Sequence, residues 1–306
     1  MSVNSKKQPQ ARPSSRTLAA ARARGSARPR TAFVLSGGAS LGAIQVGMLH
    51  ALYESGVIPD LLVGTSAGAL NAAFIASRPQ TIRTSRELGR IWCDLEREDI
   101  FPVSMGALVG GLCGRRDHLI PDRGLRTLVR RHVQFGDLAD AAIPVHVVAF
   151  DLNEGCEVLL SEGPAVDAIV AAASIPGLFP PVRIGGRRLV DGGVVNNTPI
   201  SHAVALGAER IYVLPTQDPA RPLAHVSIGA LDAGIHALSL LIDRQLEADL
   251  ERFSRVAELI VLPARNATSV QPASFEHASR LIGETLAAAR DHLAPRSPAV
   301  PLRMAA

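Results

Sequence analysis

Cysteine and aromatic residues are scarce in this sequence, and their scarcity argues against several classes of protein. The 306 residues include three cysteines, Cys93, Cys113 and Cys156, and no C-x-x-C spacing. A disulfide framework is therefore excluded, and a cysteine zinc cluster is implausible. We expect these cysteines to be reduced thiols of a cytosolic protein. Aromatic residues make up 4% of the chain, which argues against a surface that stacks on nucleic-acid bases.

The sequence also lacks a long apolar run that is free of glycine turns. Residues 31–53 carry no Asp, Glu, Lys or Arg, and 23 residues would be long enough to cross a bilayer. However, Gly37-Gly38 interrupts this run, and backbone groups freed by a glycine turn would have no partners in lipid. The basic region in front of the run is too long for a signal peptide. We therefore predict neither a transmembrane helix nor a signal peptide.

Acidic residues are absent from the first 30 positions, which contain eight Lys and Arg residues. The rest of the chain has 24 basic and 28 acidic residues, so the net charge of +4 comes from this segment. Residues 1–30 are rich in Ser, Ala and Pro, and we expect a disordered basic tail. Such a tail is commonly just solvated, and its alternative role is attraction to an anionic membrane or to nucleic acid. We expect a second tail at 296–306 and a folded domain at 31–295.

Short apolar runs alternate with segments of helical periodicity along the domain. We expect strands at 31–36, 61–63, 145–150, 210–214 and 259–262, and a hairpin around Gly185-Gly186 that leads to Asp191. We expect helices at 41–53, 67–76, 82–95, 164–174, 199–206, 228–254 and 274–293. Continuous apolar strands separated by helices are typical of a mostly parallel sheet covered on both faces. The predicted fold class is therefore α/β, with three layers in the order α/β/α.

Three glycine-containing segments are candidates for chemistry. The segment Gly64-Thr65-Ser66-Ala67-Gly68 lies between an expected strand and an expected helix, where a nucleophile elbow presents its serine. The loop from Ser36 to Gly42 has the same context and either binds an anion or forms an oxyanion hole through its amides. Asp191-Gly192-Gly193 ends the expected hairpin. Taken singly, each segment could also be an ordinary turn.

Together, in this order and at this spacing, the three segments resemble the patatin-like phospholipase family, bacterial type. The resemblance extends over residues 31–295 and includes the proline-rich segment 173–181. It also includes Asn196, Asn197 and Pro199 after the Asp-Gly-Gly segment. It implies a three-layer patatin-like fold and a serine acyl hydrolase without metal or organic cofactor. The implied substrate is a lipid or another acyl ester.

The resemblance also implies a role for particular residues. Ser66 would be the nucleophile of a Ser–Asp dyad, and Asp191 its general base. Gly37, Gly38 and Ala39 would supply the amides of the oxyanion hole. A serine hydroxyl needs such a base, and burial must raise the pKa of the aspartate for it to accept a proton. The chain departs from the family pattern at Ala39, which replaces a glycine, and at Leu41, which replaces an Arg or Lys.

Three other interpretations are open at this point. A catalytic triad would need a histidine after Asp191, and His277 and His292 follow it but fall in the last expected helix. A nucleotide site at the glycine loop lacks the lysine of a phosphate-binding loop. A catalytically silent module with this fold would act at a membrane surface or bind a partner, and the presence of both Ser66 and Asp191 argues against it.

The segment 100–112 is apolar and rich in glycine, and Arg115 and Arg116 follow it. It is either packed cap structure or a lip that contacts lipid above the serine. Peripheral membrane contact through residues 1–30 or 100–116 is therefore a hypothesis alongside a cytoplasmic location, and no specific nucleic-acid partner is expected.

Overall fold

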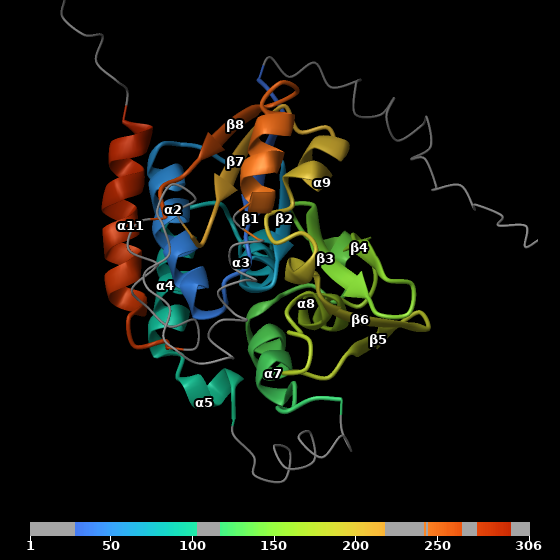
Figure 1. Cartoon of the computed structure of the whole chain (residues 1–306). Helices are drawn as coiled ribbons and strands as arrows, with labels where there is room; N and C mark the ends of the chain where they lie inside the picture. Colours follow the sequence, from blue (N-terminus) through green and yellow to red (C-terminus); the bar gives the residue numbers. More distant parts are fainter. Residues whose placement is uncertain (1–27, 103–116, 218–241, 243, 265–273, 295–306) are drawn as a thin grey trace, which may run out of the picture.

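The computed structural model describes residues 28–102, 117–217, 242, 244–264 and 274–294 (Figure 1). Within these residues, eight strands form one sheet in which β5, β6, β3, β2, β1, β7 and β8 are each hydrogen-bonded to the next, and β4 also pairs with β3. The parallel strands are β1 (Thr31–Leu35), β2 (Leu61–Thr65), β3 (Val145–Asp151), β7 (Arg210–Leu214) and β8 (Glu258–Val261). The antiparallel ones are β4 (Cys156–Leu160), β5 (Val182–Ile184) and β6 (Arg187–Asp191). The predicted, mostly parallel sheet is confirmed.

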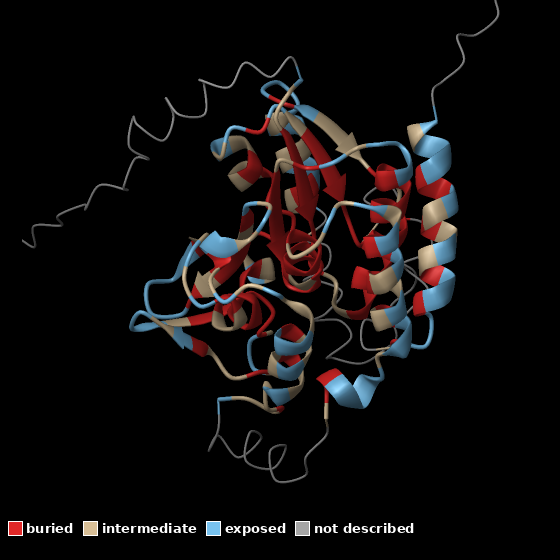
Figure 2. Cartoon of the chain, turned by 180° about the vertical axis from the view of Figure 1, so that it is seen from behind, coloured by how far each residue is buried: buried red, intermediate tan, exposed pale blue. Residues whose placement is uncertain are grey.

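Helices cover both faces of this sheet. Alternate residues of its central strands point to opposite sides, and because both sets are apolar, both faces need to be covered. Phe33 and Leu35 of β1 join the larger apolar cluster, while Ala32 and Val34 join the smaller one. On the larger side lie α2 (Ala43–Glu54), α3 (Ala67–Ala76), α4 (Ile82–Asp94), α8 (Ala165–Ala172) and α11 (Ala278–Leu293). On the other side lie α9 (Ile200–Ala205) and the helical residues 244–253. Figure 2 shows the buried strands between the two layers, and the three-layer prediction is confirmed.

Several short elements lie outside the predicted pattern. They are α5 (Arg97–Ile100), α7 (Arg123–His132), β4, and the 3₁₀ turns η1 (Ala39–Gly42), η2 (Leu138–Asp140) and η3 (Gly192–Val194). Helix α7 carries many charges and buries only one narrow face, through Leu125 and Val129. The final helix begins at Ala278, four residues later than expected. Of the helix expected at 228–254, only 242 and 244–254 lie within the described residues.

The predicted tails lie mostly outside the part of the chain that the structure describes. Residues 1–27, 103–116 and 296–306 lie outside the described residues, and with them most of both tails and of the lip segment. The last residues of the expected N-terminal tail do contact the domain. Arg28 forms an ion pair with Asp60 at 2.6 Å, and Arg30 donates to the carbonyl of Leu206 at 2.6 Å. In the described ranges, no helix has both the length and the apolar character needed to cross a membrane.

Candidate active site

Ser66 occupies the sharp turn between β2 and α3. Its backbone angles, φ 54° and ψ −126°, lie in a region that residues with a side chain rarely adopt. A Cβ on Gly64 or Gly68 would collide with nearby backbone, so both positions need glycine. The amide of Ser66 donates to the carbonyl of Ala172 at 2.9 Å, which holds the turn in place. The GTSAG segment thus forms a strained strand-to-helix turn with Ser66 at its tip.

The register of β3 explains why Asp191 lies next to this turn. β2 runs parallel to β3 and ends with Thr65 opposite Val148. β6 runs antiparallel to β3 and ends with Asp191 opposite Ala149. Since β4 pairs with Val147–Asp151 and so occupies the other edge, β2 and β6 share one edge of β3. Their carboxyl ends therefore meet, and two residues far apart in the sequence become neighbours.

The Asp191 carboxyl group is buried, with 5% of the residue exposed. It is hydrogen-bonded to the side chain of Ser66, and its Oδ1 accepts the amide of Gly193 at 2.8 Å. Burial raises the pKa of Asp191 to about 6, although the hydrogen bonds from Ser66 and Gly193 favour the carboxylate and limit the rise. At neutral pH the group is therefore ionised, yet it is a stronger base than an exposed aspartate.

The glycine loop after β1 packs directly against Ser66. A Cβ on Gly37 would lie 2.9 Å from the Cβ of Ser66, so glycine is required for this approach. The carbonyl of Gly37 accepts the Thr216 hydroxyl at 2.5 Å and the Asn197 amide at 3.3 Å. These bonds fix the position of the loop beside the serine.

The amides of this loop differ in whether they are already engaged. The amide of Gly37 donates to the carbonyl of Asn197 at 3.1 Å. Within the described part of the chain, the amides of Gly38 and Ala39 have no acceptor. Ala39 has a positive φ of 49°, the conformation that the replaced glycine of the family pattern would adopt at lower cost. The expected donor set of Gly37, Gly38 and Ala39 therefore changes, since the amide of Gly37 is occupied.

A buried polar network joins the loop to the helices behind it. Gln45 donates to the carbonyls of Ser36 and Leu214 at 2.8 and 3.0 Å. Asn71 donates to the Gln45 side chain at 2.8 Å, and the indole of Trp92 donates to Asn71 at 2.9 Å. Sequence analysis did not identify Gln45 or Asn71. Their signal is an uncharged polar residue inside an otherwise apolar helix, which must find partners when it is buried.

The pocket in front of Ser66 is narrow and apolar. Its volume is about 40 Å³. The described residues that line it come from four helices and the segments between them: Ala39, Ser66, Ala67, Leu70, Trp92, Leu95, Ile100, Phe101, Leu125, Leu128, Ala173, Ile175, Phe179 and Phe275. Ser66 is the polar residue among them, so the hydroxyl faces a site suited to hydrocarbon. Ile100 and Phe101, which begin the expected lip segment, are part of this lining.

The histidines of the triad interpretation lie elsewhere. His277 precedes the first residue of α11, and His292 lies in the last turn of that helix. The described chain shows no histidine bonded to Asp191, whose hydrogen-bond partners are Ser66 and Gly193. A search of the described residues for three His, Cys, Asp or Glu side chains grouped as metal ligands found none.

Comparison with known proteins places this geometry in a family. The model of the patatin-like phospholipase family matches residues 33–204, more than half of the chain. An uncharacterized NTE family protein of Mycobacterium tuberculosis is 33% identical over 176 residues, which are 54% of this chain and 27% of that protein. Neuropathy target esterase sws of Drosophila melanogaster is 29% identical over 192 residues, or 59% of this chain and 12% of that protein.

Among solved structures, VipD from Legionella pneumophila aligns with a TM-score of 0.43 and 14% identity, covering 85% of this chain and 68% of that one. The chain spans about a quarter or less of the length of these curated relatives. The family model, by contrast, includes the glycine loop, the Ser66 turn and Asp191 in one continuous match. The chain belongs to the patatin-like phospholipase family.

Proposed function

We propose that the domain at 31–295 is a serine acyl hydrolase that acts on lipid esters through a Ser66–Asp191 dyad. One observation carries the proposal. Ser66 has a strained backbone conformation, and its hydroxyl is hydrogen-bonded to the buried Asp191, whose pKa lies near 6. A positioned base of this kind is what a serine needs to act as a nucleophile. The family match supports lipid esters as the substrate class.

The chemistry proceeds in two steps. As the Ser66 oxygen attacks the ester carbonyl, its proton passes to Asp191, and Asp191 then gives this proton to the leaving alcohol, which leaves an acyl-enzyme. Water then attacks the acyl-enzyme and gives a proton to Asp191, which passes it to the Ser66 oxygen as the bond between that oxygen and the acyl group breaks and the fatty acid is released. The developing oxyanion is stabilised by the amides of Gly38 and Ala39, which have no other acceptor in the described chain.

Gly37 has a supporting role in this scheme. Its carbonyl is held by Thr216 and Asn197, and its amide by the carbonyl of Asn197. These bonds fix the loop position from which the next two amides would act. The helix dipole of α3, which begins directly after Ser66, adds positive potential at the same place.

The test is hydrolysis of p-nitrophenyl esters by the wild type, Ser66→Ala and Asp191→Asn. We expect kcat/KM to fall by about 10⁴-fold or more for Ser66→Ala and by about 10³-fold for Asp191→Asn. Ser77→Ala, at the other end of α3, and Asp151→Asn, a second buried aspartate at the end of β3, are matched controls that should retain activity.

The pH profile of the wild type gives a second readout. Because the base must be ionised, kcat/KM should rise with pH through about 6 and then level off. Full activity in Asp191→Asn would show that the base is misassigned. A folded wild type that hydrolyses no ester would favour the catalytically silent module.

A further inference from the structure

The pocket in front of Ser66 has an apolar neighbour. A second cavity, of about 30 Å³, lies between α3, α4 and α7. Leu70, Trp92, Leu95 and Leu128 line both the Ser66 pocket and this second cavity. Among the described residues, only these shared side chains therefore separate the two cavities, and no backbone segment lies between them.

The sequence of the three helices accounts for this arrangement. Each contributes side chains at positions i, i+3, i+4 and i+7, which lie on one face of a helix. The contributing residues are Ala67, Leu70, Asn71 and Phe74 of α3; Leu88, Ile91, Trp92 and the following Leu95 of α4; and Leu125, Leu128, Val129 and His132 of α7. Together the three faces line an apolar path that begins at Ser66 and is interrupted by the side chains shared between the two cavities.

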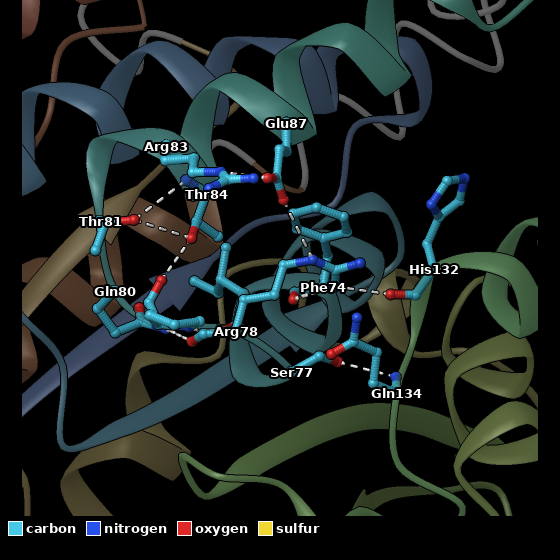
Figure 3. A network of polar contacts seen from close by, with 12 residues as sticks. Phe74, Ser77, Arg78, Gln80, Thr81, Arg83, Thr84, Glu87, His132 and Gln134 are labelled. Atoms are coloured by element: carbon cyan, nitrogen blue, oxygen red, sulfur yellow. Dashed lines mark hydrogen bonds and ion pairs between the residues drawn. The ribbon is translucent and has the colours of Figure 1, made fainter.

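Arg78 lies beyond Phe74, at the end of this path that is remote from Ser66, and Figure 3 shows its contacts with Phe74, His132 and Glu87. Its guanidinium lies 3.8 Å from the centre of the Phe74 ring and donates to the carbonyls of Phe74 and His132 at 3.1 and 2.8 Å. Glu87 of α4 lies 3.7 Å from the same guanidinium. Since Phe74 and His132 line the second cavity and Glu87 belongs to α4, the Arg78 contacts tie the three helices together behind that cavity. A polar, hydrogen-bonded wall therefore follows an apolar space.

We propose that the two cavities form one channel that holds a long, unbranched acyl chain, from the acyl carbon at Ser66 to the Phe74–Arg78 end. The proposal rests on the proposed function, because that function places the acyl carbon at Ser66. Phe74 follows Ser66 by eight residues, which is about 12 Å along the helix axis. A carbon–carbon bond is about 1.5 Å long, and a zigzag chain advances by less than this length with each bond. The chain therefore needs about ten bonds to cover the distance from Ser66 to Phe74. The length from Ser66 to Phe74 thus matches an acyl group of about ten to twelve carbons.

The two cavities are smaller than such a chain, so side chains at their junction must move. Leu70, Leu95 and Leu128 are half-buried. As leucines they have no polar atom that would tether them. Trp92, by contrast, is fixed by its hydrogen bond to Asn71 and is stacked on Phe275 with ring centres 6.1 Å apart. The three leucines are therefore the movable part of the junction, and Trp92 is its fixed wall.

Trp92 is the single tryptophan of the chain, so its fluorescence reports on the channel. We would titrate the Ser66→Ala protein with dodecanoic acid that carries bromine in the middle of its chain, because bromine quenches a tryptophan that it contacts. Saturable quenching is expected, and brominated butanoic acid should quench much less. This readout does not depend on catalysis.

Two further substitutions locate the binding. Val133 lines the second cavity, so Val133→Phe should fill it and weaken binding of the brominated dodecanoate at least tenfold. Gln134 is the next residue and is exposed, and Gln134→Phe adds the same ring outside the channel. Absence of saturable quenching, or equal binding by both variants, would overturn the proposal. Thermal melts of both variants show whether each is folded.

Ester hydrolysis provides a second, independent readout. Across esters of four to twelve carbons, kcat/KM should rise by about fourfold per methylene until the channel is full. Val133→Phe should lower the ratio of long-chain to short-chain kcat/KM at least tenfold, and Leu128→Ala should raise it. Equal ratios in all variants would contradict the channel. A wild type that hydrolyses no ester but binds the brominated acid would reject the proposed function and retain the channel.

Discussion

The turns that follow β1 and β2 each hold one strained residue with a side chain, but the strain has a different consequence in each. Among the described residues, Ala39 and Ser66 are those that have a positive φ without being glycine, at 49° and 54°. At Ser66 the conformation aims a hydroxyl at Asp191. Ala39 has only a methyl group, so its conformation directs nothing but the backbone amide.

This difference separates two kinds of constraint on a site. In the turn after β2, the side chain and the backbone conformation are both needed. In the turn after β1, the backbone alone carries the proposed role, and glycine would serve as well as alanine or better. Glycine should therefore relieve strain at both positions, but it should abolish activity at Ser66 and leave activity nearly unchanged at Ala39.

Apart from loss of the Ser66 or Asp191 side chain, the largest effect on activity is expected from Gly38→Ala in the first turn. A Cβ at Gly38 would lie 2.6 Å from the Cβ of the buried Thr216, so the loop must shift and its amides with it. We expect kcat to fall by about 10²–10³-fold, as for the loss of one oxyanion donor. Gly283→Ala is the matched control, because a Cβ there has no neighbour within 4 Å. Wild-type kcat in Gly38→Ala would show that this loop does not contact the reacting ester.

The second effect concerns the group that Ser66 faces. Because the pKa of Asp191 is about 6 in the folded protein and 3.8 without burial, the folded state binds this proton more tightly. The resulting stability is present below pH 3.8 and is lost as the pH rises through about 6. Asp191→Asn removes this loss and should stabilise the protein at pH 8 by about 3 kcal/mol, with little effect near pH 3.5. Urea denaturation at both pH values measures this, and an equal difference at both would exclude the protonation effect.

A smaller effect separates two inactive variants of the second turn. Ser66→Ala keeps a side chain at φ 54° and ψ −126°, whereas Ser66→Gly relieves the conformation. Despite the greater flexibility of unfolded glycine, we expect Ser66→Gly to be the more stable by about 1–2 kcal/mol. Thermal denaturation of the pair decides this. If Ser66→Ala is the more stable, the turn is not strained.

The smallest effect is expected from Ala39→Gly. Relief of the positive φ should stabilise the protein by about 1 kcal/mol, and kcat should stay within about twofold of the wild-type value. Denaturation and ester kinetics on the same preparation measure both. A large loss of kcat would mean that the methyl group itself, which lines the Ser66 pocket, contributes to substrate contact.

Much of this architecture could be predicted from local patterns. The central strands are continuous apolar runs between glycine turns, and each begins and ends within a few residues of its predicted limits. β4 and α7 were missed because an exposed edge strand and a charged helix bury too few side chains to give a clear period.

The candidate site likewise has residues that local sequence predicts and contacts that it does not. Ser66 and Asp191 are marked by their glycine neighbours, and the hairpin that ends at Asp191 follows from Gly185-Gly186. That the amide of Gly37 is occupied could not be predicted, because its acceptor, the carbonyl of Asn197, lies 160 residues away. Contacts of this length depend on strand register, which local sequence does not specify.

The bonds of the glycine loop also set when the protein could first become active during its synthesis. The Gly37 carbonyl is bonded to Thr216, and Ser36 to Thr198, so the loop is held by residues translated long after Ser66. At about 5–20 residues per second, about 8–30 s pass between translation of Ser66 and of Thr216. Throughout that time the nascent chain contains the serine but neither an anchored loop nor, until Asp191 is made, a base. The proposed site can therefore be assembled only after residues up to Thr216 have been translated.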